Sequence, residues 1–170
     1  MKTWLILAVS IAVTHLSAQT PDLMSKGSKG IYTSAKNNVL KAAEAVPESD
    51  YSFKPTEKVR TFGQLVAHVA DGQYEFCSAA LGDTSEHPSV EKSKTTKAEL
   101  VDALKTAFSY CDKAYDGLTD AHAADEVKFF GRPMAKINVL GFNTAHTDEH
   151  YGNIVTYMRI KNLVPPSSKQ

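Results

Sequence analysis

The sequence predicts an all-α protein whose fold is a four-helix bundle. Apolar residues recur at steps of three and four along four long segments, and polar or proline-containing stretches separate these segments. We find no run of alternating apolar and polar residues, so no strand is expected. At 170 residues, the chain has the length of one domain. We expect residues 19–170 to form a single bundle domain.

Residues 1–18 have the pattern of a secretory signal peptide. Lys2 makes the start positive, an apolar run covers residues 4–13, and Ala18 is a small residue before the expected cleavage site. The run is about half of the roughly 20 apolar residues that a membrane-spanning helix needs. An uncleaved anchor is the alternative. Cleavage predicts an exported protein, periplasmic or extracellular, with no membrane association afterwards.

The first predicted helix covers residues 22–46, and Pro47 ends it. Its apolar stripe, with steps of four, four, three and four, is Ile31, Ala35, Val39, Ala42 and Val46. Residues 48–60 have no helical period and are predicted to be a loop. The second helix is expected to begin at Thr61, which forms a capping box with Gln64, and to stop at Gly82.

Residues 82–95 are a polar linker, and a second capping box, Thr96 with Glu99, opens the third helix. Residues 119–133 are expected to be irregular. The fourth helix covers residues 134–162. Long linkers permit a crossover in which two consecutive helices run parallel. Parallel second and third helices would place Cys77 and Cys111 at one level, whereas antiparallel helices would separate them.

Charge and cysteine content exclude several classes of protein. Lys+Arg and Asp+Glu both number 19, and this balance argues against a nucleic-acid partner. Two cysteines are too few for a cysteine-rich zinc module. Both lie on apolar stripes, which suits inert or bridged cysteines better than a reactive thiolate.

His146 and His150 lie four residues apart on the fourth helix, on one face that the helical projection turns into the bundle. Two imidazoles at this spacing can share one metal ion. A chance pair of core or surface histidines is the alternative. His68, at the margin of the second helix's apolar face, is the third candidate ligand, and a hydrogen-bonded boundary histidine is its alternative. Asp71, one turn further on, is considered as an additional ligand.

Two stretches resemble the DinB/YfiT-like family. The first is Phe53-Lys54-Pro55-Thr56 and Val59-Arg60-Thr61-Phe62-Gly63, followed by His68. The second is His146-Thr147-Asp148-Glu149-His150, followed by the amide Asn153. The resemblance covers nearly all of residues 19–170. It implies an up-down-down-up four-helix bundle that binds a divalent metal through His68, His146 and His150.

That helix order makes the second and third helices parallel, so it predicts a Cys77–Cys111 disulfide with Cα atoms about 4.4–6.8 Å apart. A metal ion held by three histidines keeps one coordination position free of protein ligands, as the metal ions of catalytic sites do. We therefore expect a metal-dependent hydrolase or a thiol or group transferase that acts on a small molecule. Asp71 and Glu75 are the candidate general acid or base.

Zinc or nickel is the expected metal, with iron or copper as alternatives. The competing hypothesis is a non-enzymatic metal-binding or stress-related bundle. A homodimer is left open. An enzyme would need accessible space above the metal, lined by an acid or base, whereas a metal-binding module would fill the coordination sphere.

Overall fold

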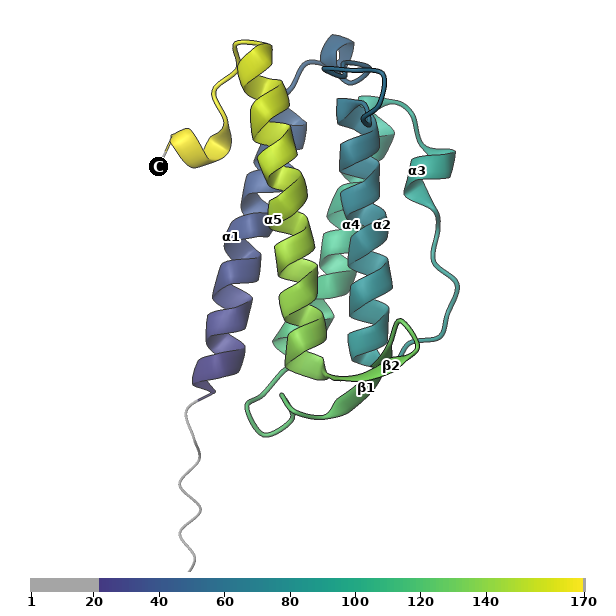
Figure 1. Ribbon diagram of the computed structural model, residues 1–170, viewed down its shortest axis with the longest axis vertical. Helices are drawn as coiled ribbons and strands as arrows, with labels where there is room; N and C mark the ends of the chain where they lie inside the picture. The colour runs from purple at the N-terminus through teal and green to yellow at the C-terminus, as the bar shows by residue number, and fades with distance from the viewer. Residues whose placement is uncertain (1–21, 170) are drawn as a thin grey trace, which may run out of the picture.

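Four long helices form the molecule in a computed structural model, which describes residues 22–169 (Figure 1). They are α1 (Leu23–Ala45), α2 (Phe62–Leu81), α4 (Lys97–Asp116) and α5 (Lys136–Ile160). α1 and α5 run in one direction, and α2 and α4 run in the other (Figure 1). The predicted four-helix bundle with up-down-down-up order is confirmed. The predicted signal peptide, residues 1–18, lies outside the described residues.

The local signals at the start of α2 and α4 act as predicted. Thr61 and Gln64 exchange side-chain and backbone hydrogen bonds in a complete capping box, and Thr96 and Glu99 do the same. Each box satisfies backbone N–H groups that the first helical turn leaves without partners. These caps fix where the two parallel helices begin, and therefore the level at which their residues meet.

A long crossover connects the two parallel helices, and it contains a short helix, α3 (Val90–Ser93), that packs against α2. Cys77 of α2 and Cys111 of α4 form a disulfide with a Cα–Cα distance of 5.2 Å. The predicted pairing is therefore confirmed. This disulfide links the two helices that the crossover leaves side by side (Figure 1).

The segment before α5 differs from the prediction. It contains an antiparallel hairpin of β1 (Glu126–Phe129) and β2 (Arg132–Ala135), where an irregular segment without strands was expected. Its two-residue turn has positive φ at both Phe130 (46°) and Gly131 (77°), which matches the twist of a tight hairpin. Strands of four residues are too short to show an alternating pattern, so the expectation was wrong here.

The core confirms the apolar stripes except at Ile31 of α1 and Phe142 of α5. Ile31, placed on the buried face of α1 by its spacing, is 62% exposed, and its neighbour Tyr32 is buried instead. Tyr32 stacks on Tyr115 with ring centroids 3.8 Å apart and donates a hydrogen bond to Asp112. The aromatic stacking and the hydrogen bond favour the rotation of α1 that buries Tyr32.

Two 3₁₀ turns, η1 (Glu48–Asp50) and η2 (Pro166–Ser168), complete the described elements. Within residues 22–169, we find no helix with both the length and the hydropathy that crossing a membrane requires.

Candidate metal centre

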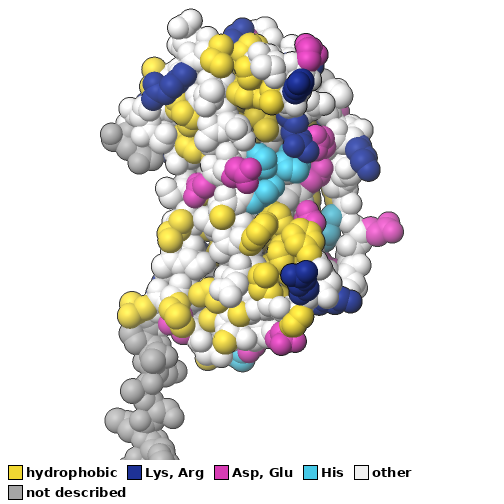
Figure 2. All heavy atoms as spheres, viewed as in Figure 1, with side chains coloured by type: hydrophobic (Ala, Val, Ile, Leu, Met, Phe, Trp, Pro, Cys, Tyr) yellow, Lys and Arg dark blue, Asp and Glu magenta, His cyan; other side chains and the backbone are white. Residues whose placement is uncertain are grey.

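Three histidines from two helices meet midway along the bundle. His68 lies on α2, and His146 and His150 lie one turn apart on α5. The Nε2 atom of His146 is 3.3 Å from Nε2 of His68 and 3.1 Å from Nε2 of His150. Figure 2 shows the histidine side chains at the surface, with acidic side chains beside them and an apolar patch below. One face of the cluster is therefore open to small molecules.

The separations of the His146 nitrogen from the other two fit one divalent ion, and all three ligand atoms lie within 4.8 Å of one another. A tetrahedral ion with metal–nitrogen distances of about 2.0–2.1 Å holds its ligands about 3.3–3.4 Å apart. An octahedral ion at about 2.1 Å holds neighbouring ligands about 3.0 Å apart. The observed separations of 3.1 and 3.3 Å fall in this range. The donor set could thus hold a metal, and imidazole ligands suit zinc, nickel, copper and iron alike.

The environment keeps the α5 histidines in the form that binds metal. Burial, followed by the neighbouring His150 and His68, lowers the pKa of His146 to about 4. Burial also lowers the pKa of His150. Both imidazoles are therefore neutral at pH 7, as a metal ligand must be. Their Nδ1 atoms are buried and have no hydrogen-bond partner among the described residues, so each ring makes its polar contacts through Nε2.

The carboxylate of Glu91, which the sequence did not predict to be near the site, lies beside His68. Oε2 of Glu91 lies 3.4 Å from Nδ1 of His68, and Oε1 of Glu91 accepts a hydrogen bond from Nε of Arg60 at 2.8 Å. If the ring proton is on Nδ1, the Glu91 carboxylate is the nearby acceptor and the Nε2 lone pair is left for a metal. Carboxylates commonly fix the ring and tautomer of metal-binding histidines in this way.

The carboxylate of Asp71 binds the backbone at the start of α3. Its Oδ1 and Oδ2 accept the backbone N–H groups of Val90 and Glu91, at 2.6 and 3.1 Å. Asp71 therefore holds α3 in place and, through it, the carboxylate that contacts His68. With both oxygens engaged, Asp71 is not part of the cluster of potential ligand atoms. Its predicted role as general acid or base stays a prediction.

Glu75, the second predicted acid or base, is an exposed residue of α2. Within residues 22–169, its carboxylate makes no hydrogen bond or ion pair with another side chain. Its catalytic role stays a prediction. Sequence spacing does not predict the contact between Glu91 and His68. Glu91 lies 23 residues after His68, and the fold of the crossover brings the two together.

Gly72 allows His146 to approach α2. A Cβ atom at position 72 would lie 2.7 Å from Cε1 and 3.0 Å from Nδ1 of His146. The first distance is shorter than real Cβ contacts, and the second is tighter than most of them. The His146 ring also meets the ring of Phe76, one turn along α2, with ring centroids 5.0 Å apart. Gly72 and Phe76 together set the position of this ligand.

We expect Gly72→Ala to weaken metal binding at least about tenfold, because the added methyl displaces the His146 ring from the shared centre. Isothermal titration of zinc into the metal-free protein measures the effect. Gly152→Ala, also in a helix, is the matched control, since a Cβ there meets nothing within 4 Å. Equal zinc affinity in the two variants would show that Gly72 does not position the ligand.

A buried polar layer supports α5 beneath the histidines. Nε2 of Gln73 donates to Oγ1 of Thr147 at 3.0 Å, and Nδ2 of Asn143 donates to Oε1 of Gln73 at 3.1 Å. The three side chains are fully buried. Buried hydrogen bonds of this kind are costly to break, so they oppose sliding or rotation of α5 against α2. The layer thus helps to keep the ligands on the two helices in register.

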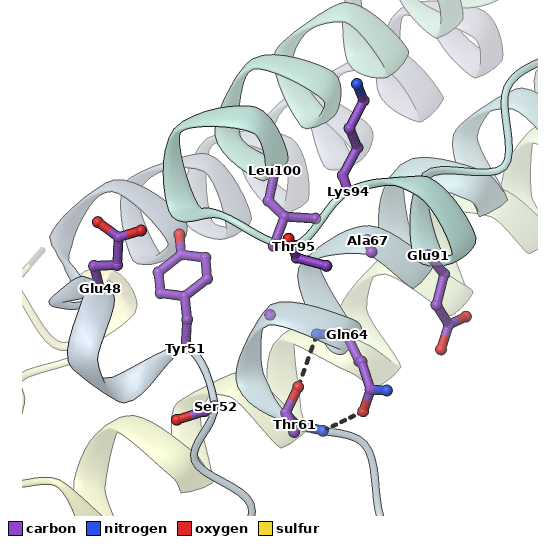
Figure 3. Close-up of a pocket in the computed structure, with 11 residues that line it drawn as sticks. Glu48, Tyr51, Ser52, Thr61, Gln64, Ala67, Glu91, Lys94, Thr95 and Leu100 are labelled. Carbon is purple, nitrogen blue, oxygen red and sulfur yellow. Dashed lines mark hydrogen bonds between the residues drawn. The ribbon is translucent and has the colours of Figure 1, made fainter.

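A separate pocket of about 360 Å³ lies near the starts of α2 and α4 (Figure 3). Tyr51, Thr61 and Gln64 line it on one side, and Glu91 lies at its edge. In Figure 3, the Glu91 carboxylate points away from the pocket centre. None of the three histidines lines this pocket. It is therefore a neighbour of the metal centre and not the space above it.

The fold and the histidine cluster define the protein as an up-down-down-up four-helix bundle with a three-histidine site that could hold a metal. The chain belongs to the DinB superfamily, whose family model matches residues 31–154. The membership predicted from the motifs around His68 and His146 is thereby confirmed.

Relatives with solved structures share this fold. A DinB-like protein from Bacillus cereus ATCC 10987 superposes with a TM-score of 0.73 at 20% identity, over 83% of this chain and 95% of that one. The uncharacterised protein YjoA of Bacillus subtilis strain 168 is 24% identical over 131 residues, which cover 75% of this chain and 84% of YjoA. Its structure superposes with a TM-score of 0.65.

A mycothiol-dependent maleylpyruvate isomerase superposes with a TM-score of 0.63 at 16% identity. The match covers 78% of this chain but only 61% of the isomerase. At this identity, the likeness shows a shared fold alone.

Proposed function

We propose that His68, His146 and His150 bind one divalent metal ion, zinc or nickel, and that this centre catalyses a reaction of a small molecule. The observation that carries the proposal is the convergence of the three Nε2 atoms, 3.1 and 3.3 Å apart, at an open face of the bundle. A divalent ion held by three imidazoles would supply an open position that lowers the pKa of a bound water or thiol towards neutrality.

The residues around the centre have distinct tasks in this proposal. Glu91 holds the proton on Nδ1 of His68 and keeps its Nε2 available. Arg60 holds Glu91, and its guanidinium adds a positive charge close enough to lower the pKa of both His146 and His150. Glu75 remains the candidate to move a proton at the exposed edge.

Two reaction types fit this centre: hydrolysis, and transfer involving a small thiol. The fold shared with a mycothiol-dependent isomerase supports the thiol type. We favour hydrolysis, since we propose that the protein is exported and low-molecular-weight thiols are mainly cytosolic. The Cys77–Cys111 disulfide supports export, because such bonds persist in oxidising compartments.

We expect metal-loaded protein to hydrolyse an activated ester such as 4-nitrophenyl acetate, and metal-free protein to be inactive. A parallel assay with glutathione and an aryl halide tests thiol transfer.

Glu91→Gln should lower metal affinity about 10- to 100-fold, because the amide holds the His68 tautomer less firmly. Glu75→Gln is the matched carboxylate control for metal binding and should leave the metal affinity unchanged.

The alternative is a non-enzymatic metal-binding module. Metal-loaded protein that is inactive in both assays and takes no added ligand, such as azide on a cobalt-substituted centre, would favour that module. A spectral change with azide would instead support an open catalytic position.

A further inference from the structure

Four phenylalanines lie together directly beside the histidine cluster, and we call them the aromatic shelf. They are Phe76 of α2, Phe129 of β1, Phe130 of the hairpin turn and Phe142 of α5. Their ring centroids lie 4.2–6.4 Å apart in six pairs. Phe76 also meets the ring of His146 edge-on, with centroids 5.0 Å apart. The shelf is therefore continuous with a candidate metal ligand.

Two members of the shelf are exposed although the other two are buried. Phe130 is 65% exposed and Phe142 is 48% exposed, whereas Phe76 and Phe129 are 3% and 4% exposed. In Figure 2, an apolar patch lies directly below the histidines on the same face. Contiguous exposed apolar groups beside polar ones are typical of binding sites.

The hairpin holds Phe130 outward in an unfavourable backbone conformation. Its φ of 46° is in the left-handed region, where asparagine or aspartate before a glycine would serve the turn better. A bulky aromatic residue at this position is therefore not explained by the turn. Its ring instead extends the surface that Phe129 and Phe142 begin.

The size of the exposed surface matches a small molecule better than a protein. At roughly 200 Å² for a whole phenylalanine side chain, the exposed parts of Phe130 and Phe142 amount to about 200 Å². A stable protein interface needs about 800 Å² on each partner. A single phenyl ring or branched alkyl group would cover the shelf.

We propose that the aromatic shelf binds the apolar part of the substrate of the metal centre, a small molecule with an aryl or branched alkyl group. This inference rests on the proposed function and adds its substrate class. Phe142 lies one helical turn before His146, where side chains are about 5–6 Å apart. The apolar group must therefore be joined to the reacting group by a link of only a few bonds.

Two hydroxamates test this inference in zinc-loaded protein, because they share one metal-binding headgroup. Phenylacetohydroxamate carries an aryl group, and acetohydroxamate does not. We expect the aryl compound to bind about tenfold more tightly in isothermal titration, which corresponds to about 1.4 kcal/mol. The double variant Phe130→Ser/Phe142→Ser should lose this preference and keep its affinity for acetohydroxamate. Ile31→Ser, which removes an exposed apolar side chain from α1, should keep the preference.

A metal-free experiment separates failure of the shelf from failure of the metal centre. In metal-free protein, benzyl alcohol should shift the NMR signals of Phe130 and Phe142 and leave those of Ile31 unchanged. If the protein shows these shifts but binds no zinc, the aromatic shelf still binds an apolar group, whereas the proposed function is contradicted. If benzyl alcohol causes no shifts, or if the two hydroxamates bind with equal affinity, the proposed binding role of the aromatic shelf is contradicted. Sedimentation provides a further test. If the unchanged protein is a dimer and the double variant is a monomer, the aromatic shelf binds a second copy of the chain and not a substrate, which contradicts the proposal.

Discussion

Replacing His146 with alanine is expected to abolish metal binding, with zinc falling from about one ion per chain to a trace. His146 is the central ligand, because its Nε2 lies 3.3 Å from that of His68 and 3.1 Å from that of His150. The two remaining imidazoles leave too few ligands for a stable site. Elemental analysis of the purified protein after dialysis measures the change.

Thermal unfolding provides a second readout of the same substitution. A ligand at 1,000 times its Kd stabilises the folded state by about 4 kcal/mol, so saturating zinc should raise the Tm of the unchanged protein. It should leave the Tm of the His146→Ala variant nearly unchanged. His122→Ala is the control, since the side chain of this exposed loop histidine pairs with Asp125 and, within residues 22–169, with no other side chain. A variant that still binds one zinc tightly would contradict a centre built on His146.

Removing the Cys77–Cys111 disulfide is expected to lower the free energy of unfolding by about 3–4 kcal/mol. The two cysteines are 34 residues apart, and the chain-entropy relation gives this value for a closed loop of that length. For a domain of this size, the loss corresponds to a fall in Tm of roughly 6–15 °C. The effect arises in the unfolded chain, which gains conformations when the link is absent.

Urea unfolding of the oxidised protein, the reduced protein and the Cys77→Ala/Cys111→Ala variant measures this loss. The reduced protein and the variant should both be destabilised, and reductant should not change the variant further. Two free thiols in protein purified without reductant would show that the bond does not form. A loss below about 1 kcal/mol would show that the bond does not restrain the unfolded chain.

Much of the fold is predictable from the sequence because its signals are local. The capping boxes at Thr61 and Thr96 begin α2 and α4 at the expected residues. Helical spacing also brings His146 and His150 together, since residues four apart always share a face. The parallel order of α2 and α4 is not local. It followed from the family resemblance, and the disulfide prediction depended on it.

The missed features depend on contacts between distant segments. Glu91 reaches His68 only because Asp71 caps α3 and fixes the crossover, and no spacing rule relates these three residues. Phe142 projects onto the inner arc of α5, yet it is 48% exposed because the hairpin lies beside it and does not cover it. The hairpin itself carried one turn signal, Gly131, which is too weak to predict strands.

The coordination of zinc in the loaded protein tests the central claim most directly, and X-ray absorption spectroscopy at the zinc edge measures it. We predict three imidazole nitrogens at about 2.0–2.1 Å and one further light atom from an exchangeable ligand. The signal from that atom should change when a thiol is added and sulfur replaces it. Two or fewer imidazoles, or a fourth ligand from the protein that no added thiol displaces, would contradict a three-histidine catalytic centre.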